Sequence, residues 1–248
     1  MTVHRRRDVG GIGRNLESIT NHILGNHIQK SRTGNANTSI PTILGYVNPR
    51  IYGENMIWFT SDTHFGHANI LKYQADTRID PITDLTFPSV GEMDRFIINE
   101  WNAHVFPGDT VYHLGDFAFH HHGEYADRLN GNIVLIPGTH DKMNARDKKK
   151  FQIVDPIHEI DIDGRHLVLC HYAMRVWSRS HYGSIHLYGH SHGHLPPLGL
   201  SFDVGMDRWG LQPLSSVMVI LEADSLMKES GTILLDNRRA VEINEKEW

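Results

Sequence analysis

Short aliphatic or aromatic runs that each lead into a polar motif are the feature that most limits the fold of this chain. Residues 57–61, 111–114 and 133–136 have the length and composition of buried strands. A helix is predicted between the first two, over residues 91–104, because apolar residues recur near one face there. Strands that alternate with helices favour an α/β domain.

The second half of the chain predicts further strands and one more long helix. Residues 157–162 and 166–170 flank an Asp163-Gly164 turn and indicate a β-hairpin. Ser215 or Ser216 is suited to cap a helix that runs to residue 226, although residues 217–221 alone fit helix or strand equally. A short helix and two more strands complete the set, over residues 124–129, 185–188 and 200–204.

Metal-ligand residue types cluster in five places, most of them just after these strands. Imidazole nitrogens and carboxylate oxygens are the ligands that divalent transition metals take in hydrolytic enzymes. Gathered at one sheet edge, the motifs predict hydrolytic metal chemistry. They are Asp62-Thr63-His64, Gly115-Asp116, Gly138-Thr139-His140-Asp141, His171, and Gly189-His190-Ser191-His192.

Length and charge divide the chain into two unequal parts. Its 248 residues fit one large domain, predicted to span residues 56–248. Residues 1–55 are rich in Asn, Gly, Ser and Thr, and their seven Arg or Lys against three Asp or Glu give a net charge of +4. Since the whole chain has a net charge of −5, the remainder has −9. A loose, basic and dispensable extension is favoured for that segment over a nucleic-acid or targeting arm.

Membrane insertion and export are not indicated by the sequence. No run of 18 apolar residues occurs, and the amino terminus has no secretory signal pattern, so a cytoplasmic location without membrane partners is expected. Cys170 is the one cysteine and follows an apolar run, which predicts a buried structural thiol in a reducing compartment.

Together the five motifs resemble the pattern of calcineurin-like metallophosphoesterases. That pattern runs Asp-x-His, Gly-Asp, Gly-Asn-His-Asp/Glu, a later His, and Gly-His-x-His, and the resemblance covers roughly residues 56–210. Each motif alone is a weak signal, whereas five in the family's order are a strong one. The resemblance implies a four-layer α/β sandwich of two mixed β-sheets flanked by helices.

The resemblance also implies roles for individual residues around two divalent metal ions. Manganese is favoured, with iron, zinc and cobalt as alternatives, because mixed nitrogen and oxygen ligation suits all four. Metal coordination lowers the pKa of bound water toward about 7 and so supplies a hydroxide nucleophile. The implied residues are Asp62, His64 and His192 for the first metal, Asp116 as the bridge, His171 and His190 for the second, His140 as proton donor, and Asp141 to orient the ring of His140.

Thr139 departs from the family pattern, which has asparagine at this position as a ligand of the second metal. The threonine hydroxyl is shorter and a poorer donor, so weakened binding of the second ion is expected. Three interpretations stay open: a tolerated substitute ligand, a lesion that binds metal or substrate without turnover, and a protein that has become a binding module.

Residues next to the ligands are candidates for contact with substrate. The first motif continues as Asp-x-His-Phe-Gly-His, which resembles a subgroup of the family, and His67 and Asn69 are predicted to donate to a phosphate oxygen. Arg175, four residues beyond His171, is predicted to bind phosphate through its guanidinium group. A helix-capping loop and a surface arginine are the alternatives. The run of residues 120–122, three histidines, is predicted to be a solvated loop, and packing is favoured over base stacking for Trp177, Tyr182 and Trp209.

The predicted function is metal-dependent hydrolysis of phosphomonoesters or phosphodiesters. A nuclease acting on DNA or RNA is the main alternative in substrate. A catalytically weakened scaffold that holds metal is the alternative of another class, and it is suggested only by Thr139.

Overall fold

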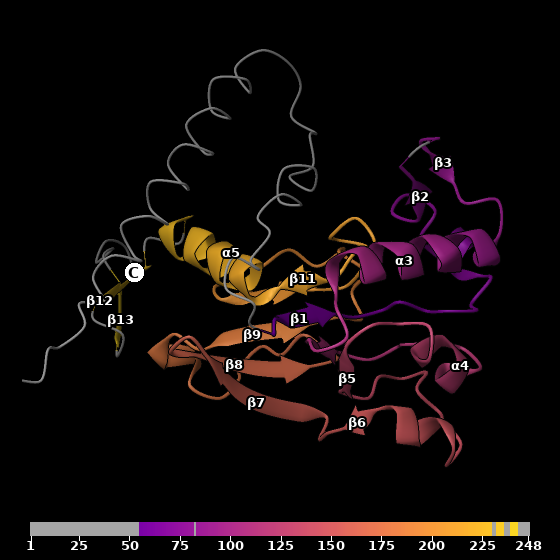
Figure 1. The fold of residues 1–248 in the computed structure, drawn as a ribbon. Coiled ribbons are helices and arrows are strands. Elements are labelled where there is room, and N and C mark those ends of the chain that lie inside the picture. Colours follow the sequence, from indigo (N-terminus) through magenta and orange to yellow (C-terminus); the bar gives the residue numbers. More distant parts are fainter. Residues whose placement is uncertain (1–54, 82, 230–231, 236–238, 243–248) are drawn as a thin grey trace, which may run out of the picture. The chain divides into compact units, whose positions relative to one another are not determined.

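The computed structural model describes residues 55–81, 83–229, 232–235 and 239–242. The predicted extension over residues 1–55 falls outside this range except for its last residue, so it stays a prediction. Figure 1 shows the elements, with the bounds β1 Ile57–Thr60, α2 Ile70–Tyr73, β2 Ile79–Asp80, β3 Leu85–Thr86, α3 Val90–His104, β4 Thr110–His113, α4 His122–Ala126, β5 Asn132–Leu135, η4 Asp147–Lys150, β6 Gln152–Ile153, β7 Ile157–Ile162, β8 Arg165–Cys170, η5 Ser180–Tyr182, β9 Ile185–Tyr188, β10 Ser201–Asp203, β11 Leu214–Ser215, α5 Ser216–Glu229, β12 Thr232–Leu235 and β13 Arg239–Glu242.

A five-stranded mixed sheet has the order β11-β1-β4-β5-β6. Strands β1, β4, β5 and β6 are parallel, and β11 pairs antiparallel with β1. The register aligns Thr60 with His113 and His113 with Leu135, so three parallel strands end side by side. The residues that follow these strands therefore emerge at one edge of the sheet.

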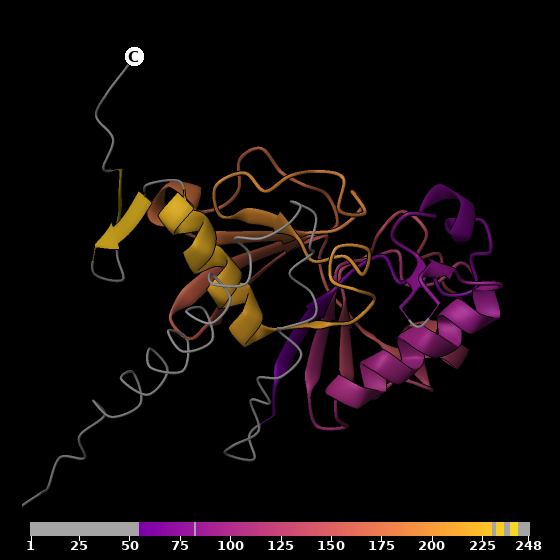
Figure 2. The same cartoon turned by 90° about the horizontal axis from the view of Figure 1, so that it is seen from above.

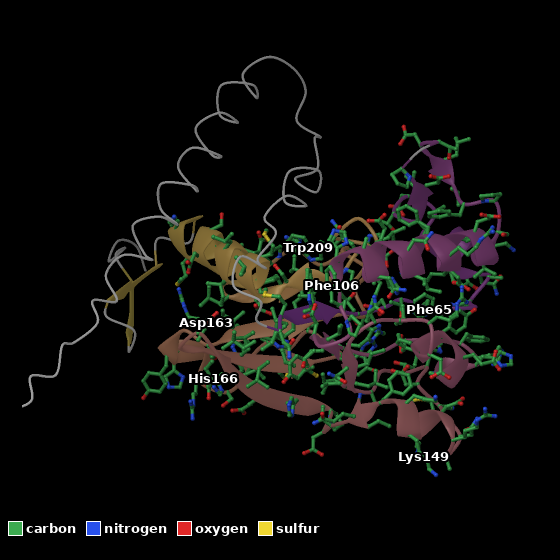
Figure 3. All side chains as sticks on the ribbon, viewed as in Figure 1. Phe65, Phe106, Lys149, Asp163, His166 and Trp209 are labelled. Atoms are coloured by element: carbon green, nitrogen blue, oxygen red, sulfur yellow. The ribbon has the colours of Figure 1, made fainter. Side chains whose placement is uncertain are left out.

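A four-stranded mixed sheet has the order β10-β9-β8-β7. Strands β7 and β8 form the predicted hairpin, with Ile157 opposite Cys170 and Ile162 opposite Arg165. Figure 3 labels Asp163 and His166 at the turn end of this hairpin. Strands β8, β9 and β10 run parallel, so their carboxyl ends also share one edge.

Alternating side chains of the five-stranded sheet enter two different cores, as parallel strands buried on both faces require. Trp58 packs in the first core with Ile97 and Trp101 of α3. Phe59 lies in the second core with Leu169 and Leu187, along with residues of α5. Figure 2 shows the two long helices, α3 and α5, from above. The predicted fold class, two mixed sheets with helices, is confirmed.

The other face of the four-stranded sheet carries a fully buried histidine, His186. Its Nδ1 pairs with the carbonyl oxygen of Val168 at 2.9 Å, and its Nε2 accepts the backbone N–H of Met174 at 3.0 Å. The ring of Trp177 lies 5.5 Å from that of His186. The segment between β8 and β9 is thereby held against this face.

Several elements differ in detail from the sequence predictions. Helix α4 begins at His122 instead of residue 124, and its first residue is buried, so the prediction of a solvated loop is wrong for His122 and holds for the exposed His120 and His121. The ambiguous residues 217–221 lie within helix α5. The single cysteine is buried, as predicted. In the described part of the chain, no helix combines the length and apolar character that a bilayer crossing needs.

Candidate metal centre

Hydrogen bonds join the edges of the two sheets where the predicted motifs lie. The N–H of Met206, after β10, donates to the carbonyl oxygen of Ser61, after β1, at 3.0 Å. Within the five-stranded sheet, Asp62 N–H donates to the carbonyl oxygen of Gly115 at 3.0 Å. His171, which follows β8, pairs through Nδ1 with the carbonyl oxygen of Leu114 at 2.7 Å. Loops from both sheets therefore meet in one place.

Asp62, His64 and His192 form a group that we call the inner cluster. Each offers one ligand atom, and these atoms all lie within 4.8 Å of one another. His64 Nε2 is 3.8 Å from Asp62 Oδ1, and both side chains are buried. Figure 3 labels Phe65, the residue that follows His64.

Asp116, His171 and His190 form a second group, the outer cluster, whose ligand atoms also lie within 4.8 Å of one another. Asp116 Oδ2 is 3.5 Å from His171 Nε2 and 3.8 Å from His64 Nε2, so this oxygen faces both clusters. Asp116 and His171 are buried, whereas His190 is exposed. Six of the seven residues predicted as metal ligands are thus brought together in two groups of three, and Thr139 is the seventh.

Several ligand atoms in these clusters are buried without a hydrogen-bond partner. They are Asp62 Oδ1, both ring nitrogens of His64, and His171 Nε2. Leaving such atoms unpaired costs free energy, roughly 1–3 kcal/mol each for neutral groups. His171 Nδ1 faces a carbonyl oxygen and carries the proton, which leaves the Nε2 lone pair free to bind an ion. The donor set therefore fits divalent cations.

The ionisation of the inner cluster also fits a cation. Burial raises the pKa of Asp62 to about 7. Burial, with Arg78 nearby, lowers the pKa of His64 to about 3. His64 is therefore neutral, which is the form that binds metal, and a cation beside Asp62 would favour its charged form.

Left-handed backbone conformation is concentrated in the two clusters. Five of their six residues have positive φ angles: Asp62 57°, His64 50°, Asp116 55°, His190 65° and His192 48°. For a residue with a side chain, this conformation costs roughly 1–2 kcal/mol, although Asp and His tolerate it better than most. Such strain collects at functional sites, where the surrounding structure maintains it.

Glycines allow the motif loops to approach one another closely. A Cβ atom on Gly115, whose φ is 96°, would lie 2.5 Å from the backbone nitrogen of Gly138. A Cβ atom on Gly138 would lie 2.5 Å from Asp116 Oδ1, and one on Gly189 would meet Ser61 Oγ and lie 2.5 Å from Asp62 Oδ2. A side chain at any of the three positions would push the ligand loops apart.

Arg78 and Asp207 support the inner cluster through hydrogen bonds, and the sequence interpretation missed both. The fully buried Arg78 donates from Nε and Nη2 to the two carboxylate oxygens of Asp207, each at 2.8 Å. Its Nη2 also donates to the carbonyl oxygen of Asp62 at 2.5 Å. Asp207 Oδ2 lies 2.7 Å from His192 Nδ1, which directs His192 Nε2 toward the cluster. Such outer partners orient metal-binding histidines.

Below both clusters, a chain of hydrogen bonds runs through His113, another residue that the sequence interpretation missed. The N–H of Gly115 donates to His113 Nδ1 at 3.2 Å, and His113 Nε2 pairs with Thr63 Oγ1 at 3.0 Å. Thr63 Oγ1 donates to the carbonyl oxygen of Phe117 at 2.6 Å, so the network assigns the proton to Nε2 of His113. Burial lowers the pKa of His113 to about 4, and the ring is neutral.

Asp141 occupies a different position from the one predicted, which was to orient the ring of His140. Its Oδ2 accepts the N–H groups of Asp116 and Gly138, both at 2.8 Å, and its Oδ1 accepts that of Phe117 at 2.9 Å. Asp141 therefore shapes the loop that presents Asp116. The buried His122 lies beside it, with Nε2 3.6 Å from Asp141 Oδ1.

His140 lies at the solvent side of the clusters. Its backbone N–H donates to Asp116 Oδ1 at 2.8 Å, and its Nε2 is 4.0 Å from Asp116 Oδ2. The ring is 5.7 Å from that of His64 and 6.2 Å from that of His67. The exposed ring of His140 is thus held next to Asp116 by its own backbone.

Thr139 directs its hydroxyl to Tyr172, with 2.8 Å between the two oxygens. The ring of Tyr172 lies 4.8 Å from the rings of both His171 and His190. Where the family pattern has a ligating asparagine, this chain has a hydroxyl paired with a tyrosine that borders the outer cluster.

The three predicted substrate contacts lie in different surroundings. His67 is close to the inner cluster, with its ring 5.4 Å from that of His64. Asn69 is exposed at the N-cap of α2, and Arg175 is exposed in the segment after His171. Of the three, only His67 has a described contact with the clusters.

The two mixed sheets, with the predicted motifs gathered at one edge, have the architecture that the resemblance to calcineurin-like metallophosphoesterases implied. A sequence relative is the uncharacterized protein MJ1445 of Methanocaldococcus jannaschii, 30% identical over 176 residues in an alignment that covers 66% of this chain and 89% of the relative. The chain belongs to the same family as MJ1445.

Comparison with family models and solved structures adds little about chemistry. No protein-family model matches the chain. A protein of unknown function from Aquifex aeolicus, AQ665, is 25% identical with a TM-score of 0.52, and the alignment covers 70% of this chain and 100% of AQ665. Yfce, a phosphoesterase from E. coli, is 16% identical with a TM-score of 0.31, over 60% of this chain and 77% of Yfce.

Proposed function

We propose that this protein is a metal-dependent phosphoesterase that hydrolyses phosphomonoesters or phosphodiesters. The observation that carries the proposal is the pair of three-residue clusters that share one sheet edge, with buried ligand atoms that lack any other partner. Asp62, His64 and His192 would hold one divalent ion, and His171 and His190 the other. Manganese is the first candidate, and iron, zinc and cobalt suit the same mixed ligands.

Asp116 is proposed to bridge the two ions. His140 N–H occupies its Oδ1, and its Oδ2 lies within 4.0 Å of ring nitrogens from His64, His171 and His140. Bound ions would supply an activated water and neutralise charge on the phosphate oxygens. Two neighbouring metal ions need a carboxylate between them, and Asp116 lies between the histidines of the two clusters.

His140 is proposed to give a proton to the leaving oxygen. Its ring is exposed to incoming substrate, while its backbone is anchored to Asp116. General acid catalysis by a positioned side chain contributes typically about 10²–10⁴ in rate. A scaffold would have no need to keep this histidine together with both clusters, so the scaffold alternative is disfavoured.

The test is hydrolysis of chromogenic phosphomonoester and phosphodiester substrates by the full chain with added Mn²⁺. We expect His140→Asn to lower kcat by about 10²–10⁴ while calorimetry still detects metal binding. Asp116→Asn should lose turnover and one class of metal site. Asp127→Asn and His121→Asn are matched controls, because both residues are exposed on or beside α4. Unchanged hydrolysis by Asp116→Asn would refute the mechanism.

A further inference from the structure

Exposed aromatic side chains lie next to His140, on the solvent side of the clusters. The ring of Phe119 is 6.0 Å from that of His140 and stacks on His67 at 4.6 Å with an interplanar angle of 9°. Tyr73 lies 6.4 Å from His67. We call His67, Tyr73 and Phe119 the aromatic platform. The ring of His67 lies 5.4 Å from that of His64 in the inner cluster, so the aromatic platform extends from this cluster to the solvent.

The backbone beneath the aromatic platform is firmly held. Phe119 N–H donates to the carbonyl oxygen of Phe65 at 2.9 Å, and Phe65 forms a bridge with Ala118. The buried ring of Phe65 stacks on Tyr125 at 4.8 Å. Tyr73 closes helix α2, where its N–H donates to the carbonyl oxygen of Asn69. The backbone that carries Phe119, 41% exposed, and Tyr73, 68% exposed, is therefore fixed by the fold.

The sequence suggested packing or base stacking for three aromatic residues, Trp177, Tyr182 and Trp209. The two tryptophans form hydrogen bonds and pack within the protein. Trp209 is buried, and its Nε1 donates to the carbonyl oxygen of Asp203 at 2.9 Å. Trp177 donates from Nε1 to Ser184 and packs near His186. Tyr182 is exposed on η5 and contacts the ring of His181. The aromatic platform, in contrast, adjoins both His140 and the inner cluster.

We propose that the aromatic platform stacks on a nucleobase carried by the leaving group, so that the substrate is a small nucleoside phosphodiester. The inference rests on the proposed function, because it takes His140 to face the leaving oxygen. Aromatic side chains stack on any base through its flat face, and removal of one such ring typically weakens binding about tenfold. A flat group that departs beside His140 would meet Phe119, with Tyr73 next to the neighbouring His67.

The charge of the domain favours a short substrate over a long nucleic acid. Residues 56–248 carry a net charge of −9, so they offer little electrostatic grip on a phosphate backbone. Affinity for a nucleotide would then depend on base stacking more than on backbone contacts. In the reaction, the bond from phosphorus to the leaving oxygen breaks and one from phosphorus to a water oxygen forms. The leaving oxygen takes the proton of His140, and a proton from the water restores it through solvent.

The test compares thymidylyl thymidine with its counterpart that has hydrogen in place of both bases. Both substrates have the same scissile bond and leaving alkoxide. With Mn²⁺, we expect the full chain to have a kcat/KM about tenfold or more higher for the base-containing substrate. Phe119→Ala should lower kcat/KM more for the base-containing substrate than for the abasic one and so remove most of this preference, whereas Phe119→Trp should restore it.

Phe106→Ala is the matched control. Phe106 is 42% exposed, nearly the same as Phe119, but it precedes β4, whereas Phe119 lies beyond its other end. Figure 3 labels Phe106 apart from Phe65 of the ligand loop. Its substitution should leave the base preference intact.

The outcomes separate this inference from the proposed function. Equal rates on the two substrates, or a preference that survives both Phe119→Ala and Tyr73→Ala, would overturn the aromatic platform while leaving the phosphoesterase proposal in place. Absence of hydrolysis of these and of chromogenic esters would overturn both. Calorimetry with thymidine 5′-monophosphate and inorganic phosphate supplies a second readout. Tighter binding of the nucleotide that is lost in folded Tyr73→Ala supports the proposal, and equal binding contradicts it.

Discussion

The inner and outer clusters have the same kinds of ligand but very different surroundings. In the inner cluster, Asp62 and His64 are buried, and His192 is oriented by Asp207, itself held by the buried Arg78. In the outer cluster, His190 is exposed and adjoins Tyr172. A ligand fixed by charged hydrogen bonds loses little freedom when it binds an ion. The comparison therefore teaches that the ligand atoms of the inner cluster are fixed by their surroundings, whereas the outer cluster is open to solvent.

The largest expected effect is on metal affinity, when one histidine is removed from each cluster in turn. We expect metal-free protein to bind Mn²⁺ in a tight and a weaker class, with His192→Ala losing the tight class and His190→Ala the weaker one. The loss of Mn²⁺ affinity should exceed the roughly 10–100-fold loss that follows removal of a residue that only hydrogen-bonds to a metal ligand. Calorimetric titration of the three proteins measures it. If both variants lose the same class, the clusters do not act as separate sites.

A change at His113 tests whether both clusters depend on one support, because its partners Thr63 and Gly115 belong to the loops of the inner and outer clusters. Burial lowers the pKa of His113 to about 4, below the ordinary 6.5, so the unfolded chain binds more protons between these values. The stabilisation from His113 is present above pH 6.5 and is lost as the pH falls toward 4, by roughly 3 kcal/mol.

The measurement is urea unfolding of metal-free wild type and His113→Gln at pH 7 and pH 4.5. The difference between the two proteins is compared because Asp62 acts in the opposite sense: burial raises its pKa to about 7. We expect the advantage of the wild type to shrink on acidification. An advantage that does not change with pH would contradict the assignment of a neutral, buried His113.

Asp207→Asn should weaken the inner cluster alone. The neutral amide is a poorer partner for His192 Nδ1 and for Arg78, so we expect Mn²⁺ affinity of the tight class to fall about 10–100-fold. The weaker class should be unchanged. Asp224→Asn, which removes the partner of Arg165 far along the chain in α5, is the control. An unaltered tight class in Asp207→Asn would show that the inner cluster needs no such support.

Thr139→Asn should produce the smallest change and should reduce the difference between the clusters. An amide oxygen in place of the hydroxyl that pairs with Tyr172 would add a ligand to the outer cluster. We expect about five- to tenfold tighter binding in the weaker class, the equivalent of roughly 1 kcal/mol. Metal stoichiometry and turnover of the two proteins are compared. Identical behaviour would refute a weakened second site.

Much of the fold could be predicted because strand-forming runs and parallel register are local signals. Thr60, His113 and Leu135 end neighbouring strands, and this register carries Asp62 and Asp116 to the same edge. The predicted ligands accordingly lie together in the structure, while their roles stay predictions.

The supporting residues could not be predicted in the same way. Arg78 and Asp207 are separated by 129 positions and belong to no motif, so only the folded chain pairs them. Asp141 lies next to His140 in sequence, yet the turn directs its carboxylate to backbone N–H groups of the Asp116 loop and not to the neighbouring ring. Left-handed conformation at Asp62 or His190 has no signal in residue type, because Asp and His also occupy ordinary regions.

If the clusters bind metal ions as proposed, the left-handed backbone of five of their six residues would link the stability of this protein to metal binding. Each such residue makes the unliganded fold less stable by an amount that matters against a net stability of roughly 5–15 kcal/mol. An ion that binds the native chain and not the unfolded one raises stability in proportion to the logarithm of its free concentration. In a cell starved of that ion, more chains would be unfolded and open to proteolysis, so the abundance of the protein would follow the supply of the metal.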